Sequence, residues 1–97
     1  MRLTNYKVNF SGIQQNHETQ KYINEIVMSL THRVPSESSF VLNISENQKK
    51  VLGDFTVKSS VIKFESVKKA DTAINVMNLI FEDMVQQIEF WIAKRVV

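Results

Sequence analysis

The sequence predicts an α+β fold with the order β-α-β-β-β-α, in which two helices pack on one face of a four-stranded sheet. Two observations support this prediction. Segments that alternate apolar and polar residues, as half-buried strands do, are interspersed with two segments of helical periodicity. The chain has 97 residues, of which 43% are apolar. This length supports one hydrophobic core, so we expect a single domain over residues 1–97.

The first strand and the first helix have clear boundary signals. Residues 6–10 alternate apolar and polar side chains, and Gly12 follows them. Asn16 is a predicted N-cap, because its side-chain oxygen can accept a backbone N–H of the first helical turn. Pro35 is expected to stop this helix, since its ring disfavours helical geometry at the preceding residue. The predicted core face of the helix holds Tyr22, Ile23, Ile26, Val27 and Leu30.

Three further strands are expected between the helices. Residues 40–44 alternate, residues 46–50 form a polar turn, and residues 51–58 and 61–67 read as a hairpin around Ser59-Ser60. The first crossover, through the helix, should place the second strand parallel to the first. The remaining strands are expected to pair antiparallel, which leaves one face of the sheet in contact with water.

The register of the last hairpin has two alternatives. A two-residue loop would pair Phe55 with Phe64 on the inner face, as two aromatic partners. The same register would place Asp54 opposite Glu65, which is an unfavourable pair of like charges. A bulge or a slip of register near Gly53 is therefore the alternative.

The last helix carries more apolar residues than one buried stripe needs. Asp71 is a predicted N-cap. Val76, Leu79 and Phe90 fall outside the main stripe, and we interpret them as a narrow seam that contacts a protein partner or a second copy of the chain. Scattered surface apolar residues are the alternative. The main stripe holds Ala73, Ile74, Met77, Ile80, Phe81, Met84, Val85, Ile88, Trp91 and Ile92.

Charge is unevenly distributed along the chain. Residues 1–70 contain ten basic and six acidic side chains, whereas residues 71–97 contain two basic and four acidic ones. Such asymmetry can steer a partner to one part of the surface. We predict a sequence-independent RNA-phosphate surface, with scattered solubilising charges as the alternative. The predicted RNA-binding residues are Lys7, Lys21, Lys49, Lys50, Lys58, Lys63, Lys68 and Lys69.

The residues offer little for catalysis. The chain has no cysteine, which excludes disulfides, thiolate metal sites and a cysteine nucleophile. His17 and His32 are too far apart along one helix to share a metal, and Glu82 and Asp83 diverge by about 100° as helix neighbours. We therefore predict no enzyme activity, no catalytic residue, no metal, no cofactor and no small-molecule substrate. The longest apolar run, residues 90–93, is far too short to span a membrane, so a cytoplasmic protein is expected.

Two stretches resemble a known family. "YKVNFSGIQQNHETQKYINEIVMSL" and "ADTAINVMNLIFEDMVQQIEFW" are similar to the short ribosome hibernation promoting factors, the ribosome-associated inhibitor family. The second stretch follows the family pattern D-x(4)-[IV]-x(2)-L-[IL] with a later Gln. The matching residues are Asp71, Val76, Leu79, Ile80 and Gln86 or Gln87.

The resemblance implies a function without catalysis. Members of the family bind the small ribosomal subunit in the channel for mRNA and tRNA, stop translation and preserve idle ribosomes under stress. Their rRNA contacts come largely from Lys and Arg on helices and loops. This chain departs from that habit on the exposed side of its last helix, and because the sequence ends at Val97 we expect the short form, without the second, dimer-forming domain of the long form. The departing positions are Asn75, Asn78, Glu82, Gln86 and Glu89.

Overall fold

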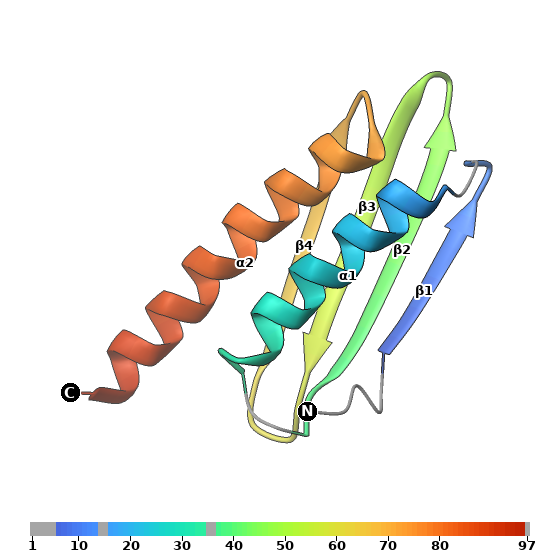
Figure 1. The fold of residues 1–97 in the computed structure, drawn as a ribbon. Helices are drawn as coiled ribbons and strands as arrows, with labels where there is room; N and C mark the ends of the chain where they lie inside the picture. The colour runs from blue at the N-terminus through green and yellow to red at the C-terminus, as the bar shows by residue number, and fades with distance from the viewer. Residues whose placement is uncertain (1–5, 14–15, 35–36, 97) are drawn as a thin grey trace.

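The computed structural model describes residues 6–13, 16–34 and 37–96 and contains the six predicted elements in the predicted order. Both helices lie on the same face of the sheet (Figure 1). The predicted α+β architecture is therefore confirmed. The elements are β1 (Tyr6–Ser11), α1 (His17–Thr31), β2 (Ser39–Asn47), β3 (Lys50–Lys58), β4 (Lys63–Ala70) and α2 (Ala73–Val96).

The sheet has the strand order β1-β2-β3-β4. β1 pairs parallel with β2, with Tyr6 opposite Phe40 and Phe10 opposite Ile44. The two other pairings are antiparallel. The parallel pairing confirms the prediction, because a strand that returns through a helix re-enters the sheet in the same direction.

The core lies between the sheet and the helices. Alternate residues of the strands point toward the helices, and the rings of Phe40 and Phe55 stack there with centroids 6.3 Å apart. Burying one such large apolar side chain stabilises the fold by about 1.5–3 kcal/mol relative to exposing it. The largest fully buried side chains are Phe55, Ile23, Leu30, Leu42, Ile44, Met77, Ile80, Met84, Ile88, Val27, Val57 and Val76.

α1 begins and ends through local hydrogen bonds. The Asn16 side-chain oxygen accepts the Thr19 N–H at 2.8 Å, which confirms the predicted N-cap. The helix ends at Thr31, where the backbone N–H of His32 bonds to the Leu30 carbonyl. Pro35, the predicted stop, lies outside the described residues.

The β2–β3 hairpin is tighter than predicted. Its turn consists of Gln48 and Lys49 alone, with φ of 53° and 66°. Two successive residues at positive φ are typical of the two-residue hairpin turn whose twist matches the strands. The polar segment 46–50 is therefore mostly strand: Asn47 and Lys50 face each other as the last pair of the β2–β3 ladder.

The β3–β4 register differs from the predicted two-residue loop by two positions. Val57 lies opposite Phe64, and pairing continues through Gly53 without a bulge. The connecting loop spans residues 59–62. Within it, the Ser59 hydroxyl accepts the N–H groups of Val61 and Ile62, each at 3.2 Å.

The reason for this shift is local. A two-residue loop needs positive φ, which serine adopts at a cost, whereas the longer loop uses the serine hydroxyl to satisfy backbone groups. A slip of two residues keeps every side chain on its original face. It also moves Asp54 opposite Val67 and Glu65 opposite Thr56, so the like-charge pair is avoided.

α2 is capped by Thr72 and not by the predicted Asp71. The Thr72 hydroxyl accepts the Asn75 N–H at 3.1 Å, and the Thr72 carbonyl accepts the first helical bond, from Val76, at 3.0 Å. Asp71 lies one residue too early for this role and instead pairs with Lys50 at 2.6 Å. No helix in the described ranges is long and apolar enough to cross a membrane.

Replacing Thr72 with alanine should lower the free energy of unfolding by about 0.5–2 kcal/mol, because the cap hydrogen bond is lost. Asp71→Asn is the matched control and should have a smaller effect, since its ion pair with Lys50 is solvent-exposed. Urea unfolding followed by circular dichroism measures both. Equal destabilisation by the two variants would contradict the assignment of the cap.

The predicted buried face of α2 is wrong at three positions. Val76, predicted to lie outside the core stripe, is completely buried. Ile74 and Ile92, predicted to lie within the stripe, are 36% and 43% exposed. The cause is Gly53 on β3: a Cβ atom built there would lie 2.4 Å from Val76 Cγ1. Because Gly53 has no side chain, α2 approaches the sheet closely and Val76 fills the space.

Candidate nucleic-acid interface

The side chains that point away from the helices form the outer face of the sheet. It carries five lysines against two carboxylates, and polar residues together with the aliphatic side chains of Val41, Leu52 and Val67 fill the rest. None of these residues is aromatic. The outer face consists of Lys7, Asn9, Ser11, Ser39, Val41, Asn43, Ser45, Asn47, Lys50, Leu52, Asp54, Thr56, Lys58, Lys63, Glu65, Val67 and Lys69.

The outer-face lysines form two groups at opposite ends of the sheet. Lys58 and Lys63 are direct cross-strand partners, and Lys7 is the second residue of β1, at the same end of the sheet. Lys50 and Lys69 lie at the other end. Lys63 and Lys69 are six positions apart on β4, which is about 20 Å of extended strand. Like charges directly opposite each other are destabilising in a sheet, so the Lys58–Lys63 pair would gain from an anionic partner.

The other predicted lysines lie elsewhere. Lys21 is exposed on α1, in the helical layer, and Lys49 occupies the tip of the β2–β3 hairpin. Lys68 points to the helix side of the sheet, with its ammonium 3.7 Å from Asp83 Oδ2. The structure thus gathers five of the eight lysines on one face and does not gather all eight. RNA binding by any of them stays a prediction.

The middle of the outer face is polar and not positive. The Asn9 side-chain amide donates to Asn43 Oδ1 at 2.8 Å. Asp54 lies opposite Asn43 on β3, and its buried Oδ1 has no hydrogen-bond partner among the described residues. The predicted lysines therefore do not form one unbroken positive track.

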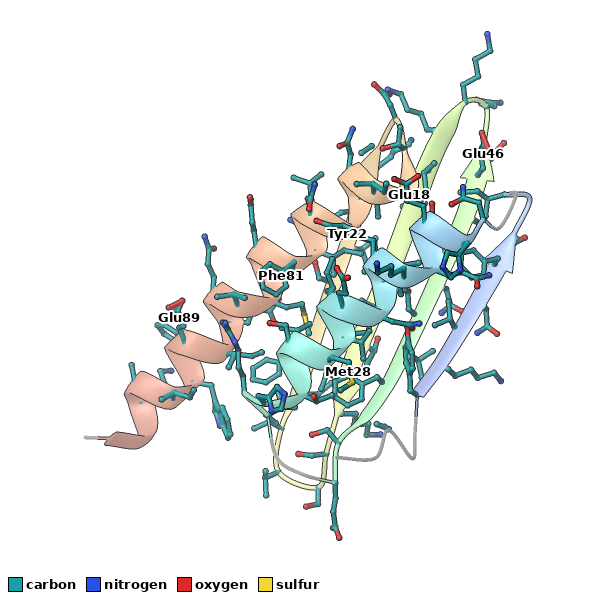
Figure 2. The ribbon with its side chains drawn as sticks, in the orientation of Figure 1. Glu18, Tyr22, Met28, Glu46, Phe81 and Glu89 are labelled. Carbon is teal, nitrogen blue, oxygen red and sulfur yellow. The ribbon has the colours of Figure 1, made fainter. Side chains whose placement is uncertain are left out.

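The helical layer is more acidic than the outer face. Figure 2 shows Tyr22 and Phe81 between the two helices, and Glu18 and Glu89 on the same side of the molecule. The exposed side chains described on this layer include Glu18, Glu25, Glu82 and Glu89 against Lys21, Arg33 and Lys94. An anionic ligand is therefore attracted more strongly to the outer face of the sheet.

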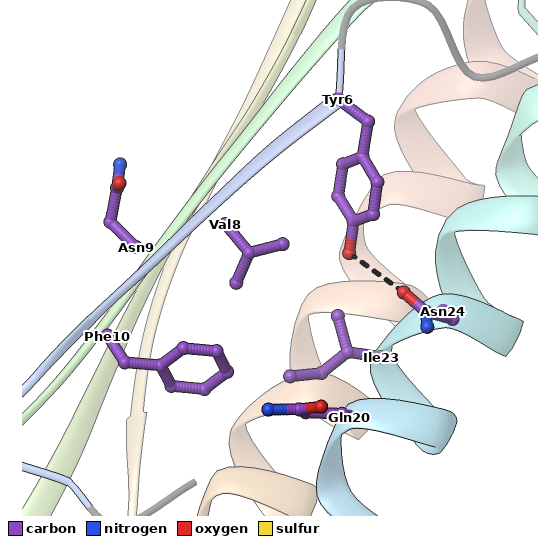
Figure 3. Close-up of a pocket in the computed structure, with 7 residues that line it drawn as sticks. All are labelled: Tyr6, Val8, Asn9, Phe10, Gln20, Ile23 and Asn24. Atoms are coloured by element: carbon purple, nitrogen blue, oxygen red, sulfur yellow. Dashed lines mark hydrogen bonds between the residues drawn. The ribbon is translucent and has the colours of Figure 1, made fainter. Parts of the chain in front are cut away.

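A pocket of about 410 Å³ lies between β1 and α1. Figure 3 shows Val8 and Phe10 directed from the strand toward Ile23 on the helix, while the Tyr6 hydroxyl donates to Asn24 Oδ1 at 3.5 Å. Burial raises the pKa of Tyr6 to about 12, so the phenol is neutral at physiological pH. The side chains that line this pocket therefore include no group suited to acid–base catalysis at neutral pH.

No metal site is formed by the part of the chain that the structure describes, since it contains no group of three or more His, Cys, Asp or Glu side chains. His17 begins α1, whereas His32 caps its end.

Asp83 anchors α2 to β4. The Ser66 hydroxyl donates to Asp83 Oδ2 at 2.6 Å, and the Gln87 amide one turn later donates to the Glu65 carbonyl at 3.0 Å. These bonds join the helix to the edge strand. The Ser66 hydrogen bond, supported by Gln87 and Lys68, lowers the pKa of Asp83 below its ordinary value of 3.8 despite partial burial.

This pKa shift predicts an acid-dependent stability. A carboxylate whose pKa is lower in the folded state stabilises the fold above its unfolded pKa, and the stabilisation is lost as the pH falls through the folded value. The difference in free energy of unfolding between the wild type and Asp83→Asn should be constant above about pH 5 and should shrink below pH 3.8. Urea unfolding across this pH range measures it. A difference that grows on acidification would contradict the assignment.

Two of the three residues in the predicted apolar seam on α2 are exposed at the surface. Val76 is in the core, whereas Leu79 and Phe90 are 40% and 64% exposed. They are eleven residues apart and so share one side of the helix. The Lys94 ammonium lies 4.6 Å from the centroid of the Phe90 ring, a cation–π contact that partly covers it. A protein contact at this seam stays a prediction.

Sequence reasoning did not single out Ser45, Asn47 and Leu52, which line the outer face beside Lys50 and Lys69. The available signal was the alternation along β3, which places Leu52 on the same face as Lys50. The cross-strand neighbours could not be identified from the sequence, because they depend on the register.

Solved structures share this fold. No protein-family model matches the sequence, and a search of curated proteins finds no match. The Protein Y N-terminal domain of Thermus thermophilus superposes with a TM-score of 0.76 at 11% identity, covering 90% of this chain and 97% of that one. A ribosomal subunit interface protein from Coxiella burnetii superposes with a TM-score of 0.64 at 16% identity, covering 90% of this chain and 98% of that one. At these identities the likeness establishes a common fold.

Proposed function

We propose that this protein is a cytoplasmic factor that binds the small ribosomal subunit through the outer face of its sheet and inhibits translation by occupying the space of mRNA and tRNA. The observation that carries the proposal is the concentration of five lysines on one open face of a fold shared with a ribosomal subunit interface protein. Ribosome hibernation under stress is the corresponding cellular role.

The chemistry of the outer face favours structured RNA. Lysine ammonium groups bind backbone phosphates without regard to sequence. A platform for single-stranded bases would need aromatic side chains, which the outer face does not have. Two lysine groups about 20 Å apart can contact two separate backbone segments of a folded RNA.

The mechanism requires no chemical step. The hydrogen bonds of Asp83 and Gln87 hold α2 against β4. The pocket between β1 and α1 has no group suited to proton transfer at neutral pH. We therefore propose inhibition by occupancy, without a cofactor or a small-molecule substrate.

Sedimentation with purified subunits tests the proposal. In low salt, the protein should pellet with small subunits and not with large ones, and prior loading of mRNA and tRNA should reduce the bound fraction. Equal binding to both subunits would contradict the specific partner. Binding to small subunits that is unaffected by mRNA and tRNA would contradict occupancy while leaving ribosome association in place.

A protein contact through α2 is the second candidate, and the exposure of Phe90 favours it. The partner would be a second copy of the chain or another protein. Under this candidate, Leu79→Glu or Phe90→Glu should convert a dimer to a folded monomer, as measured by light scattering. A wild type that is monomeric at all accessible concentrations would contradict self-association.

A further inference from the structure

A hollow of about 230 Å³ lies at the β2–β3 hairpin end of the outer face. Its centre is Leu52, which lies between Ser45 on β2 and Lys69 on β4 in the cross-strand register. Asn47 and Lys50 form the next cross-strand pair on the outer face toward the hairpin tip. Three strands thus contribute side chains to one site.

The rim of this hollow provides hydrogen-bond donors for an anion. Lys50 and Lys69 are cationic, and Ser45 and Asn47 add a hydroxyl and an amide. The Lys50 ammonium uses one of its three N–H groups on Asp71, at 2.6 Å, which leaves two donors. Lys69 forms no ion pair with the carboxylates that the structure describes.

The floor of the hollow is apolar. Leu52 is 43% exposed on a face that is otherwise mostly polar. An apolar floor beside a cationic rim suits a group with a charged end and a less polar body, such as a phosphate joined to ribose. The volume lies below the range of about 300–1,000 Å³ that is usual for sites enclosing a whole small molecule, so the hollow fits one unit of a polymer better than a free cofactor.

The hairpin holds the rim in place. Gln48 and Lys49 form a two-residue turn at positive φ, which fixes Asn47 and Lys50 as neighbours. Donors that are already in position lose less conformational entropy when a ligand binds.

We propose that this hollow binds a phosphate ester of ribose, supplied by the RNA backbone. The proposal rests on the proposed function for the source of the phosphate, since a free sugar phosphate has the same chemistry. Lys69 would provide the main charge, Lys50 a second, and Leu52 the contact with the sugar.

Titration with ribose 5-phosphate at constant ionic strength, followed by amide NMR shifts, tests the hollow itself. Shifts should concentrate on residues 45–52 and on Lys69. Lys69→Gln should weaken binding about tenfold or more, because a charged hydrogen bond is lost. Lys94→Gln, which removes one charge from the helical layer, should leave the affinity for ribose 5-phosphate unchanged. Asp71→Asn should strengthen it, because a negative charge is removed beside Lys50. Shifts spread evenly over all lysines would overturn the proposal.

Binding to small ribosomal subunits identifies the source of the phosphate. Lys69→Gln should weaken subunit binding more than Lys63→Gln, although both remove one charge. Equal losses from the two variants would overturn the proposal and leave the proposed function standing. Specific binding of ribose 5-phosphate without any subunit binding by the wild type would support the hollow with a free sugar phosphate as its ligand, and would overturn the proposed function instead.

Discussion

Replacing the five outer-face lysines with glutamine is expected to weaken binding to small ribosomal subunits by at least about 100-fold. Each lysine that neutralises a phosphate releases counterions, so removing five removes most of the sequence-independent attraction. All five side chains are exposed, so the variant should keep its fold. Equilibrium pelleting in low salt measures the change. The substituted residues are Lys7, Lys50, Lys58, Lys63 and Lys69.

Two double variants separate position from total charge. Lys58→Gln with Lys63→Gln removes two charges from the outer face, and Arg33→Gln with Lys94→Gln removes two from the helical layer. The first should weaken subunit binding markedly, whereas the second should have little effect. Similar losses from both pairs would show that net charge, and not the outer face, governs binding.

Replacing Gly53 with alanine is expected to destabilise the fold by about 1–3 kcal/mol. The new methyl group would lie 2.4 Å from Val76 Cγ1 and 2.9 Å from Ile80 Cδ1. Val76 is β-branched and completely buried, so it has little freedom to move aside. Either α2 must shift away from β3 or the core must repack. Urea unfolding measures the loss.

A compensating substitution tests this explanation. Val76→Ala removes the atom that Gly53→Ala would meet, so the double variant should be more stable than the sum of the two single effects implies. A double variant whose effects simply add would contradict a direct clash between these positions. Gly53→Ala with unchanged stability would contradict the close approach of α2 to β3.

Much of this fold could be predicted because its signals are local. The alternation in β1 and β2 and the cap at Asn16 depend on residues close in sequence, and the structure confirms them. The parallel pairing of β1 with β2 also followed, because the handedness of a strand–helix–strand crossover is nearly fixed.

The errors arose where distant residues decide the outcome. The periodicity of α2 indicated a buried stripe, but the contact between Val76 and the missing side chain of Gly53 set its orientation toward the sheet. A helical wheel describes one helix by itself, so it cannot include the contact between Val76 and Gly53, which lie 23 residues apart in sequence. The α2 cap was missed by one residue because Asp71 and Thr72 are both good caps, and Lys50 attracts the carboxylate away.

The candidate site was predicted only in part, for the same reason. Lysines could be chosen from the sequence as candidates for phosphate binding, but their grouping depends on the β3–β4 register, which the sequence left open. The register places Lys69 beside Leu52 and Lys63 beside Lys58. Lys68, one residue from Lys69, points to the opposite side and pairs with Asp83. Adjacent lysines in a strand therefore have different partners.

The dependence of small-subunit binding on salt tests the central claim most directly. Binding constants for the wild type should be measured from about 50 to about 200 mM salt. If five lysines neutralise phosphates, the logarithm of the binding constant should fall linearly with the logarithm of the salt concentration, with a slope of about −3 to −5. No binding at the lowest salt, or a constant that does not change with salt, would contradict a phosphate-binding outer face.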